Sequence, residues 1–240
     1  MSHEIYSTLS GMMGVWQQTE LIANNLANVS TQAYKAPRAS FEQVDHDPRP
    51  LGNSFSRLVP GYIDQRDGPI IQDGVETHLA IRGKGMLTVE GANGELLLTR
   101  NGNLRLDVNR FLVTQEGERV LGRSGPIQIP QDEKVEIDRE GNVTSRRDLG
   151  MDTVSTYIDQ LQFAHSDDLM PRGGGRYTPL GNVEDIMEGD VVQGALAGSN
   201  VDPMNAMVEL IQSARYFDIY QRAIQTADSL DQTAYAMPRG

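Results

Sequence analysis

Residue types that could do chemistry are scattered through this sequence of 240 residues. The histidines stand singly, with neither the i,i+4 pairing nor an acidic partner at the ligand spacing that a zinc site requires. They are His3, His46, His78 and His165. We interpret them as solvated surface side chains. Because the chain has no cysteine, it can form neither a disulfide nor a thiolate metal site.

Two other motifs approach a phosphate-binding or catalytic pattern without completing it. Gly83-Lys84-Gly85 lacks the four-residue spacer and the following serine or threonine of a P-loop, so it predicts a tight turn with a solvated lysine. Asp167-Asp168 is typical of a charged loop rather than of a catalytic carboxylate pair. The sequence therefore predicts no catalytic residue, no cofactor site and no metal site, and we expect that the protein is not an enzyme.

The charge balance limits the possible partners. The chain has 21 lysine and arginine residues against 33 aspartate and glutamate residues, a formal net charge of -12. We expect no nucleic-acid partner, because phosphates require a basic surface, and anionic membranes should repel the chain. The first residues include Glu4 and Glu20 and lack a basic region, so we expect no cleaved signal peptide. No apolar run of about 18 residues occurs, so we expect no membrane insertion.

A long amphipathic helix is predicted near the N-terminus, from Glu4 to Ala27. Its apolar residues are spaced alternately by four and three positions, which places them on one face of a helix. This stripe consists of Ile5, Leu9, Met12, Trp16, Ala23 and Leu26, with the polar Thr19 among them. A single amphipathic helix is marginally stable in water, so its stripe must be buried against another element or another chain.

A second long helix is predicted from Asp202 to Ala236, with Asp202 as the N-cap and Pro203 as the first helical residue. Its apolar residues form two stripes. The first contains Met207, Leu210, Ala214, Phe217 and Ile224, interrupted by the polar Gln221. The second contains Tyr216, Tyr220, Ala223, Ala227, Leu230 and Ala234. A helix that is apolar on two sides needs more than one partner, which favours a bundle larger than one chain can build.

Between the helices, short aliphatic and β-branched runs alternate with turn-forming pairs, a pattern typical of an antiparallel β domain. The turn pairs are Asn93-Gly94, Asn101-Gly102, Glu116-Gly117 and Glu140-Gly141. The predicted strands are 95–99, 103–108, 111–114 and 135–137. Because the whole chain has one tryptophan and five phenylalanines, we expect a core of small and aliphatic side chains.

Together these patterns predict an α+β fold, in which long N- and C-terminal helices pack as a coiled-coil-like bundle and the central domain is antiparallel all-β. The predicted organisation is an N-terminal helix in 1–30, an extended connector with at most a short strand in 31–67, the β domain in 68–164, a loop and return connector in 165–199, and the C-terminal helix in 200–240. The two helices would form one axial helical domain.

Burial of the helical stripes is the reason to expect assembly. Removing about seven apolar side chains from water contributes roughly 10 to 20 kcal/mol before the entropy of ordering is subtracted. Identical subunits can bury such stripes by stacking into tubes of nested helices, so we expect the stripe residues to form an assembly interface. Two alternatives remain open. One is a compact single domain with both helices packed on the sheet, and the other is an oligomeric β-rich binding module for a peptide or glycan.

The segments that flank the two helices resemble a known family. The run from Ala23 to Thr31, A-N-N-L-A-N-V-S-T, followed by Tyr34-Lys35, resembles the N-terminal signature of flagellar rod and hook proteins, A-N-N-L-A-N-x-x-T-x-G-[FY]-[KR]. The run from Gly198 to Asp202 and the helix after it resemble the C-terminal segment of the same family. The residues that carry the two motifs are Asn24, Asn25, Leu26, Asn28, Thr31, Ser199, Asn200 and Val201.

The resemblance extends to the middle of the chain, with two departures. Leu79 to Gly85 and Leu98 to Gly102 are similar to the β-domain segments of the family. Ala33 stands where the family usually has glycine, and Met86-Leu87 stands where an aromatic residue usually follows the glycine. Because alanine tolerates a positive φ poorly, Ala33 is expected to alter the turn after the first helix.

The resemblance implies a structural subunit of the bacterial flagellar basal-body rod, the periplasm-spanning axial shaft that transmits torque. It also implies self-assembly, contacts with other flagellar rod and hook proteins, and secretion by the flagellar type III export apparatus without a cleaved signal. Within the family, the short chain and the run from Val120 to Ile127 look most like a proximal rod protein. A distal rod protein or another flagellar axial protein is the alternative.

Overall fold

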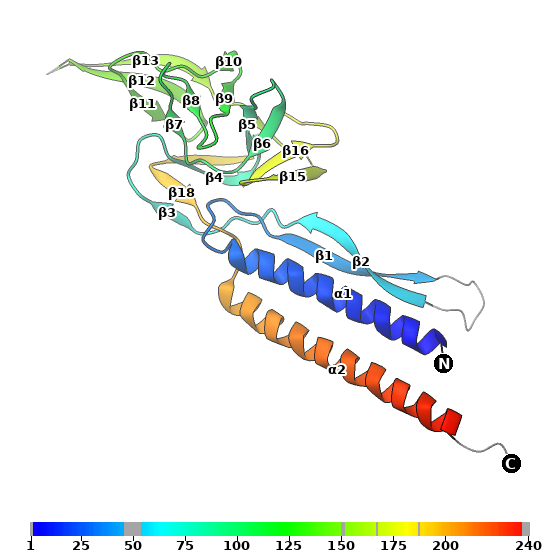
Figure 1. Ribbon diagram of the computed structural model, residues 1–240. Helices are drawn as coiled ribbons and strands as arrows, with labels where there is room; N and C mark the ends of the chain where they lie inside the picture. Colours follow the sequence, from blue (N-terminus) through cyan, green and yellow to red (C-terminus); the bar gives the residue numbers. More distant parts are fainter. Residues whose placement is uncertain (1, 46–53, 150–151, 167, 187, 237–240) are drawn as a thin grey trace. The chain divides into compact units, whose positions relative to one another are not determined.

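The computed structural model describes residues 2–45, 54–149, 152–166, 168–186 and 188–236. The chain divides into two compact units (Figure 1). The first, called the helical unit below, comprises Met1–Val29, Ala36–Asp64 and Val201–Gly240. The second, called the β unit, comprises Ser30–Lys35 and Gln65–Asn200. Each unit thus combines segments that are far apart in the sequence.

The helical unit contains two long helices and one β-hairpin. Helix α1 covers Ser2–Ala27 and helix α2 covers Pro203–Ala236. Strands β1 (Pro37–Asp45) and β2 (Ser54–Ile63) pair antiparallel. Helix α1 contacts α2 and also both strands of the hairpin, so it lies between them (Figure 1).

The coiled-coil-like bundle predicted from the sequence is wrong. β-Strand is the largest class of secondary structure, at 41%, and the described residues contain two helices, one N-terminal and one C-terminal. A bundle needs several helices to enclose a common core. Here α1 packs against one helix and against a hairpin, so a helix pair and two strands take the place of the bundle.

The β1–β2 hairpin lies in the segment 31–67, where the sequence predicted an extended connector with at most a short strand. Prolines and mixed charges hide the strand pattern in this segment, but the prolines lie where strands tolerate them. Pro37 begins β1, and Pro60 lies opposite Ala39 beside the irregularity in the strand register. The hairpin therefore keeps most of its ladder despite two residues that cannot donate a backbone hydrogen bond.

The β unit contains the remaining strands of the described residues, and most of them are short. They are β3 (Ile70–Gln72), β4 (Leu79–Lys84), β5 (Met86–Glu90), β6 (Leu96–Thr99), β7 (Arg105–Leu106), β8 (Leu112–Val113), β9 (Arg119–Gly122), β10 (Gly125–Pro126), β11 (Lys134–Ile137), β12 (Asn142–Leu149), β13 (Asp152–Gln160), β14 (Phe163–Ala164), β15 (Leu169–Gly173), β16 (Arg176–Pro179), β17 (Glu188–Gln193) and β18 (Ala195–Ala197).

The largest sheet of the β unit runs in the order β15-β16-β6-β5-β9-β8-β7, with β10 beside β9 and β14 beside β5. A second sheet has the order β11-β12-β13. Two further pairs join β17 to β4 and β18 to β3, both antiparallel. Because β17 and β18 are late in the chain and β3 and β4 are early, the two ends of the β unit lie together.

The core of the β unit is aliphatic, as the low aromatic content predicted. Its buried side chains come from most of the short strands, and Phe163 joins them. The most completely buried of the large side chains in the β unit are Leu79, Ile81, Leu87, Leu98, Leu104, Leu112, Ile127, Ile129 and Leu161, each with less than 2% of its surface exposed. Branched aliphatic side chains interdigitate at high density, so this core needs little aromatic volume.

Two of the predicted glycine turns show different reasons for a glycine. Gly117 has a φ of 91°, a left-handed conformation that side chains other than glycine adopt rarely. Gly102 instead permits a close approach of two chain segments, because a Cβ atom at that position would lie 1.7 Å from the carbonyl oxygen of Leu79. The turn-forming residue pairs in the sequence identified both glycines. They could not show which glycine is needed for its φ and which for a close contact.

Strands also occupy the segment 165–199, which the sequence predicted to be a loop and return connector. The three glycines at 173–175 all have positive φ and turn the chain between β15 and β16. Tyr177 in β16 is buried and lies opposite Leu98 of β6, so this hairpin extends the largest sheet. The glycine run therefore forms a tight hairpin turn that is followed by a buried aromatic anchor.

Candidate assembly interface

One face of α1 is buried within the helical unit. Val15 and Ile22 are the buried apolar residues of this face, and Thr19 lies between them. The Thr19 hydroxyl donates to the carbonyl oxygen of Val15 at 2.8 Å, and its oxygen is 2.6 Å from the hydroxyl oxygen of Ser213 on α2. A polar contact therefore lies inside the apolar contact between the two helices.

The matching face of α2 follows a regular spacing of four and three residues. It consists of the buried Ala206 and Ser213 and the half-buried Leu210, Phe217, Tyr220 and Ile224. Small residues bring the two helices close together. A Cβ atom at Gly11 of α1 would lie 2.9 Å from the hydroxyl oxygen of Tyr220, so the missing side chain of Gly11 makes room for that ring.

The predicted α1 stripe is divided between the buried and the exposed side of the helix. Met12 and Leu26 are half-buried, whereas Leu9, Trp16 and Ala23 are exposed. The side chain of Ile5 lies outside the described residues. The spacing of large apolar residues placed the predicted stripe between the buried and the exposed face of α1. It gave no weight to Gly11 and the other small residues that form the close contact with α2.

The predicted α2 stripes are divided in the same way. Leu210, Phe217, Tyr220 and Ile224 come together on the inner face, although they had been assigned to different stripes. Met207 and Ala214 are exposed, and the side chains of Ala227 and Leu230 lie outside the described residues. The buried Ala206 and Ser213 were missed because neither is strongly apolar. Their spacing of seven residues was the available signal.

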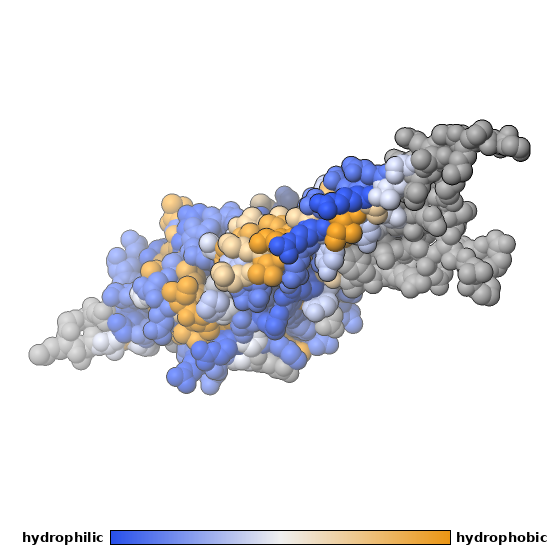
Figure 2. All heavy atoms as spheres, turned by 90° about the horizontal axis from the view of Figure 1, so that it is seen from below, coloured by the Kyte–Doolittle hydropathy of each residue, from blue (hydrophilic) through white to orange (hydrophobic). Residues whose placement is uncertain are grey.

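A second apolar face of each helix remains exposed in the single chain. On α1 it contains Leu9, Met13 and Trp16, and we call it the α1 outward stripe. On α2 it contains Met204, Met207, Val208 and Ile211, and we call it the α2 outward stripe. Figure 2 shows apolar side chains gathered over the beginning of α2. Exposed clusters of large apolar side chains on a soluble protein mark contact surfaces.

The N-terminal motif forms the end of α1. Asn25 is buried and donates from Nδ2 to the carbonyl oxygen of Pro37 at 3.4 Å, while Asn24 is exposed. The Asn28 side chain donates to the carbonyl oxygen of Asn24 at 2.9 Å. The Asn28 amide therefore bonds a carbonyl group in the last turn of α1, and the Asn25 amide joins that turn to the start of β1. Leu26 and Thr31, the other members of this motif, are half-buried.

The C-terminal motif leads into α2. Ser199 is buried, Asn200 and Val201 are half-buried, and Asp202 is exposed. The Asp202 carboxylate accepts from the backbone N–H groups of Met204 at 2.9 Å and Asn205 at 3.3 Å. These bonds confirm Asp202 as the N-cap, with Pro203 as the first helical residue.

The residues whose types could serve catalysis or metal binding do not come together in the described part of the chain. His78 bonds the Asp73 carboxylate through Nδ1 at 2.6 Å, and the Val75 N–H donates to the same carboxylate. These two hydrogen bonds lower the pKa of Asp73. The backbone of His165 pairs with that of Glu184. His46, Asp167 and the side chain of His3 lie outside the described residues. Among the described residues, no three acidic or histidine side chains lie together in a group that could hold a metal ion.

At Gly83-Lys84-Gly85 the sequence predicted a tight turn, but Gly83 and Lys84 belong to strand β4. Gly85 alone separates β4 from β5, and both glycines have positive φ. Separately, no helix in the described part of the chain is both long and apolar enough to span a bilayer.

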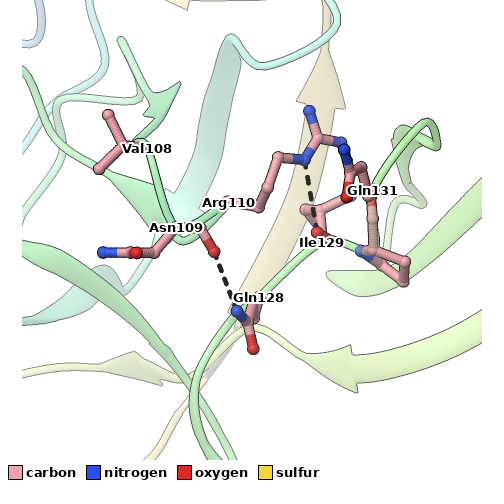
Figure 3. Close-up of a pocket in the computed structure, with 7 residues that line it drawn as sticks. Val108, Asn109, Arg110, Gln128, Ile129 and Gln131 are labelled. Carbon is pink, nitrogen blue, oxygen red and sulfur yellow. Dashed lines mark hydrogen bonds between the residues drawn. The ribbon is translucent and has the colours of Figure 1, made fainter.

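An open pocket lies beside the turn that contains Asn109 and Arg110 (Figure 3). The Arg110 side chain crosses it and donates to the carbonyl oxygens of Pro130 at 3.0 Å and Glu133 at 2.7 Å. Gln128 donates to the carbonyl oxygen of Asn109 at 2.9 Å. The polar side chains that line the pocket therefore hold the surrounding backbone in place. We assign no chemical role to them.

Comparison with known proteins agrees with this arrangement of a β unit and paired terminal helices. Residues 80–145 match the model of the flagellar hook protein FlgE/F/G D1 domain. Residues 192–237 match the model of the flagellar basal body rod FlgEFG protein C-terminal segment. The first match covers β4 to β11 and much of β12, and the second covers β18 and α2. The fold and these matches define a protein of the flagellar hook and rod class.

Full-length relatives narrow this class. The chain is 29% identical over 250 residues to the flagellar basal-body rod protein FlgG of Agrobacterium fabrum, covering 92% of this chain and 94% of the relative. It is 26% identical over 246 residues to the flagellar basal-body rod protein FlgF of Salmonella typhimurium, covering 95% of both chains. For FlgG of Borreliella burgdorferi the identity is 29% over 258 residues, covering 96% of both. The chain belongs to the flagellar basal-body rod protein family.

Proposed function

We propose that this chain is a structural subunit of the flagellar basal-body rod and that it polymerises through α1 and α2 into the axial shaft that transmits torque. The outward stripes carry this proposal. Trp16 is 57% exposed on α1 and Ile211 is 55% exposed on α2, each beside other large apolar side chains. Such clusters are costly in water, and a stack of identical subunits would bury them repeatedly.

The structure changes the reasoning behind assembly. Each helix already buries one face within its own chain, so the helices do not depend entirely on neighbouring subunits for order. What remains for assembly is the second face of each helix. The α1 outward stripe and the α2 outward stripe are the surfaces that we assign to contacts between subunits.

Family membership supports further elements of the proposal. The partners would be other copies of this chain and other flagellar rod and hook proteins, and the chain would leave the cell through the flagellar type III export apparatus without a cleaved signal. Its place would be the periplasm-spanning rod, and its role would be structural rather than enzymatic. Relatives named FlgF and FlgG both align over nearly the whole chain, and we favour the proximal rod position of FlgF, with FlgG as the alternative.

The test is a substitution that changes an outward stripe without touching the buried faces. In a strain that lacks the chromosomal copy, Trp16→Asp should reduce the swimming halo to that of the deletion strain. Intact rods purified from these cells should lack the chain. The purified variant should keep the circular dichroism spectrum of the native chain, because the Trp16 side chain is mostly exposed.

The matched control is Val108→Asp, which introduces the same charge at an apolar side chain that is 97% exposed in the β unit. This variant should swim normally. Normal swimming and normal rods with Trp16→Asp would reject the proposed interface, provided that both variants are secreted at the native level.

A further inference from the structure

The chain passes between the two units four times, after residues 29, 35, 64 and 200. On the β-unit side, backbone hydrogen bonds hold the segments at these passages together. The Ala33 N–H donates to the carbonyl oxygen of Ala197 at 2.8 Å, and the Asn200 N–H donates to that of Tyr34 at 3.2 Å. All four exits from the β unit therefore lie in three adjoining segments, 30–35, 65–67 and 197–200.

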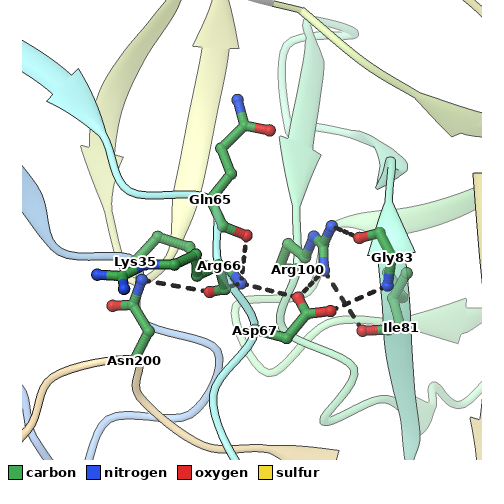
Figure 4. Close-up of polar contacts among 8 residues, drawn as sticks. All are labelled: Lys35, Gln65, Arg66, Asp67, Ile81, Gly83, Arg100 and Asn200. Atoms are coloured by element: carbon green, nitrogen blue, oxygen red, sulfur yellow. Dashed lines mark hydrogen bonds and ion pairs between the residues drawn. The ribbon is translucent and has the colours of Figure 1, made fainter.

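Lys35 ties two of these segments together (Figure 4). Its side chain is only 4% exposed, although lysine is one of the residues least often buried. The ammonium group donates to the carbonyl oxygens of Gln65 at 3.0 Å and Arg66 at 2.5 Å, and to the carboxylate of Asp67 at 3.0 Å. These three bonds match the three donors of an ammonium group.

Asp67 connects the exits to strand β4. Its Oδ1 also accepts from Arg100 at 2.6 Å, and its Oδ2 accepts from the Gly83 N–H at 2.9 Å. Burial raises the pKa of Asp67, but the bonds from Gly83, Lys35 and Arg100 outweigh burial, so the pKa lies below its usual value. The carboxylate is therefore charged at neutral pH and is shared by two cations.

Arg100 completes the connection from the other side. Its guanidinium also donates to the carbonyl oxygen of Ile81 at 3.4 Å and to that of Gly83, both in β4. Asn200, at the last exit, donates from Nδ2 to the carbonyl oxygen of Arg66 at 3.3 Å. The exits and β4 thus meet in one cluster of directional polar contacts (Figure 4).

We propose that Lys35, Asp67 and Arg100 form a clamp that holds the four exits of the β unit in one fixed arrangement against β4. A buried ion pair adds little stability compared with an apolar cluster of similar volume, so stability alone does not explain this set of charges. Directional bonds restrict geometry more than apolar contacts do. The planar arginine fork and the shared carboxylate allow few alternative arrangements of the segments that they join.

The experiment measures backbone amide hydrogen exchange by mass spectrometry on the purified full chain. Asp67→Asn keeps the shape of the side chain and removes its charge, and Lys35→Met keeps most of the volume and removes all three bonds. In both variants, peptides that cover 30–36, 65–68 and 197–201 should exchange at least tenfold faster. Peptides that cover β5 and β6 should exchange as in the native chain, because the clamp fixes the exits and does not form the core.

Lys134→Met is the matched control, because it makes the same substitution at a lysine whose side chain is 53% exposed and pairs with Glu76 on the surface. It should leave exchange in all these peptides unchanged. Native exchange at the exits of the clamp variants would overturn the proposal. Equal acceleration of the β5 and β6 peptides would also overturn it, since the residues would then serve general stability. If neither clamp variant folds, Arg100→Lys, which keeps the charge and loses the fork, is judged by the same peptides and the same two criteria.

Discussion

Thr19 of α1 and Ser213 of α2 lie with their hydroxyl oxygens 2.6 Å apart. Both hydroxyl groups also bond the carbonyl oxygen of Val15, at 2.8 Å from Thr19 and 3.3 Å from Ser213. A displacement of one helix by a single turn would separate the Ser213 hydroxyl from both the Thr19 hydroxyl and the Val15 carbonyl oxygen. The contact therefore specifies one register between two helices whose apolar residues alone would allow several.

This relationship predicts a coupled effect on stability. Ser213→Ala and Thr19→Val should each lower the free energy of unfolding by about 1 kcal/mol, because each removes the hydrogen bond between the two hydroxyl groups. The double variant should lose less than the sum, by roughly 0.5 to 1 kcal/mol, since both polar groups are then absent. Urea denaturation followed by circular dichroism measures this difference, and strict additivity would show that the two hydroxyl groups do not interact.

The backbone of Ala33 predicts a stabilising substitution. Ala33 has a φ of 52° and is buried, at the position where the resembling family usually has glycine. Since a left-handed conformation costs alanine roughly 1 kcal/mol, Ala33→Gly should raise the free energy of unfolding by about 0.5 to 1 kcal/mol.

The control for this prediction is Ala80→Gly in strand β4, where the native residue is fully buried. Here glycine relieves no strain and weakens the strand, so the free energy of unfolding should fall by about 1 kcal/mol. Chemical denaturation of both variants decides the matter. A loss of stability in Ala33→Gly would mean that packing of the Ala33 methyl group outweighs the strain.

A partly buried ion pair predicts a large cost when it is broken. Glu118 has a side chain that is 7% exposed, and one carboxylate oxygen accepts from Arg176 at 2.9 Å. Arg176→Met would leave this charge buried with the Thr114 hydroxyl as a remaining partner, and should lower the free energy of unfolding by about 2 kcal/mol. Lys134→Met, at a pair that is about half exposed on both sides, should change it by less than about 0.5 kcal/mol. Similar losses in thermal or urea unfolding would contradict this difference.

The buried phenol of Tyr177 predicts sensitivity to alkaline pH. Burial is the main reason why its pKa is raised to about 12, with a further contribution from nearby Tyr34. Because the pKa in the folded chain is above the unfolded value, the stability contributed by this proton is present below about pH 10 and is lost as the pH rises towards 12. The loss should be on the order of 2 kcal/mol.

Tyr177→Phe tests this sign, because phenylalanine has no proton to lose. At pH 8 the variant should be less stable than the native chain, because it lacks the hydrogen bond between the Tyr177 hydroxyl and the Lys35 backbone. Its free energy of unfolding should then fall less steeply than that of the native chain between about pH 10 and 12. Parallel pH profiles in urea titrations would show that Tyr177 does not contribute to the alkaline loss.

The sequence predicted the ends of the helices because helix signals are local. Glu4 to Ala27 was expected where α1 covers Ser2–Ala27, and the cap at Asp202 places the start of α2. The inner faces were harder to predict. Gly11 and Ser213 lie where the helices approach closely, and a pattern based on apolar residues does not rank such positions highly.

Features that join distant segments were beyond any local pattern. The β1–β2 hairpin lacks regular alternation, and Lys35, Asp67 and Arg100 are isolated charges in the sequence that meet only in the fold. The outward positions of Leu9 and Trp16 were included in the expected stripe, and their role in assembly stays a prediction.

Trp16 is the single tryptophan of the chain, and it lies on the α1 outward stripe. Indole emission shifts towards the blue when the ring leaves water, so intrinsic fluorescence of the unlabelled chain reports this one surface. Titration with any candidate neighbour would thus reveal whether that neighbour covers the first helix, without a dye or a tag.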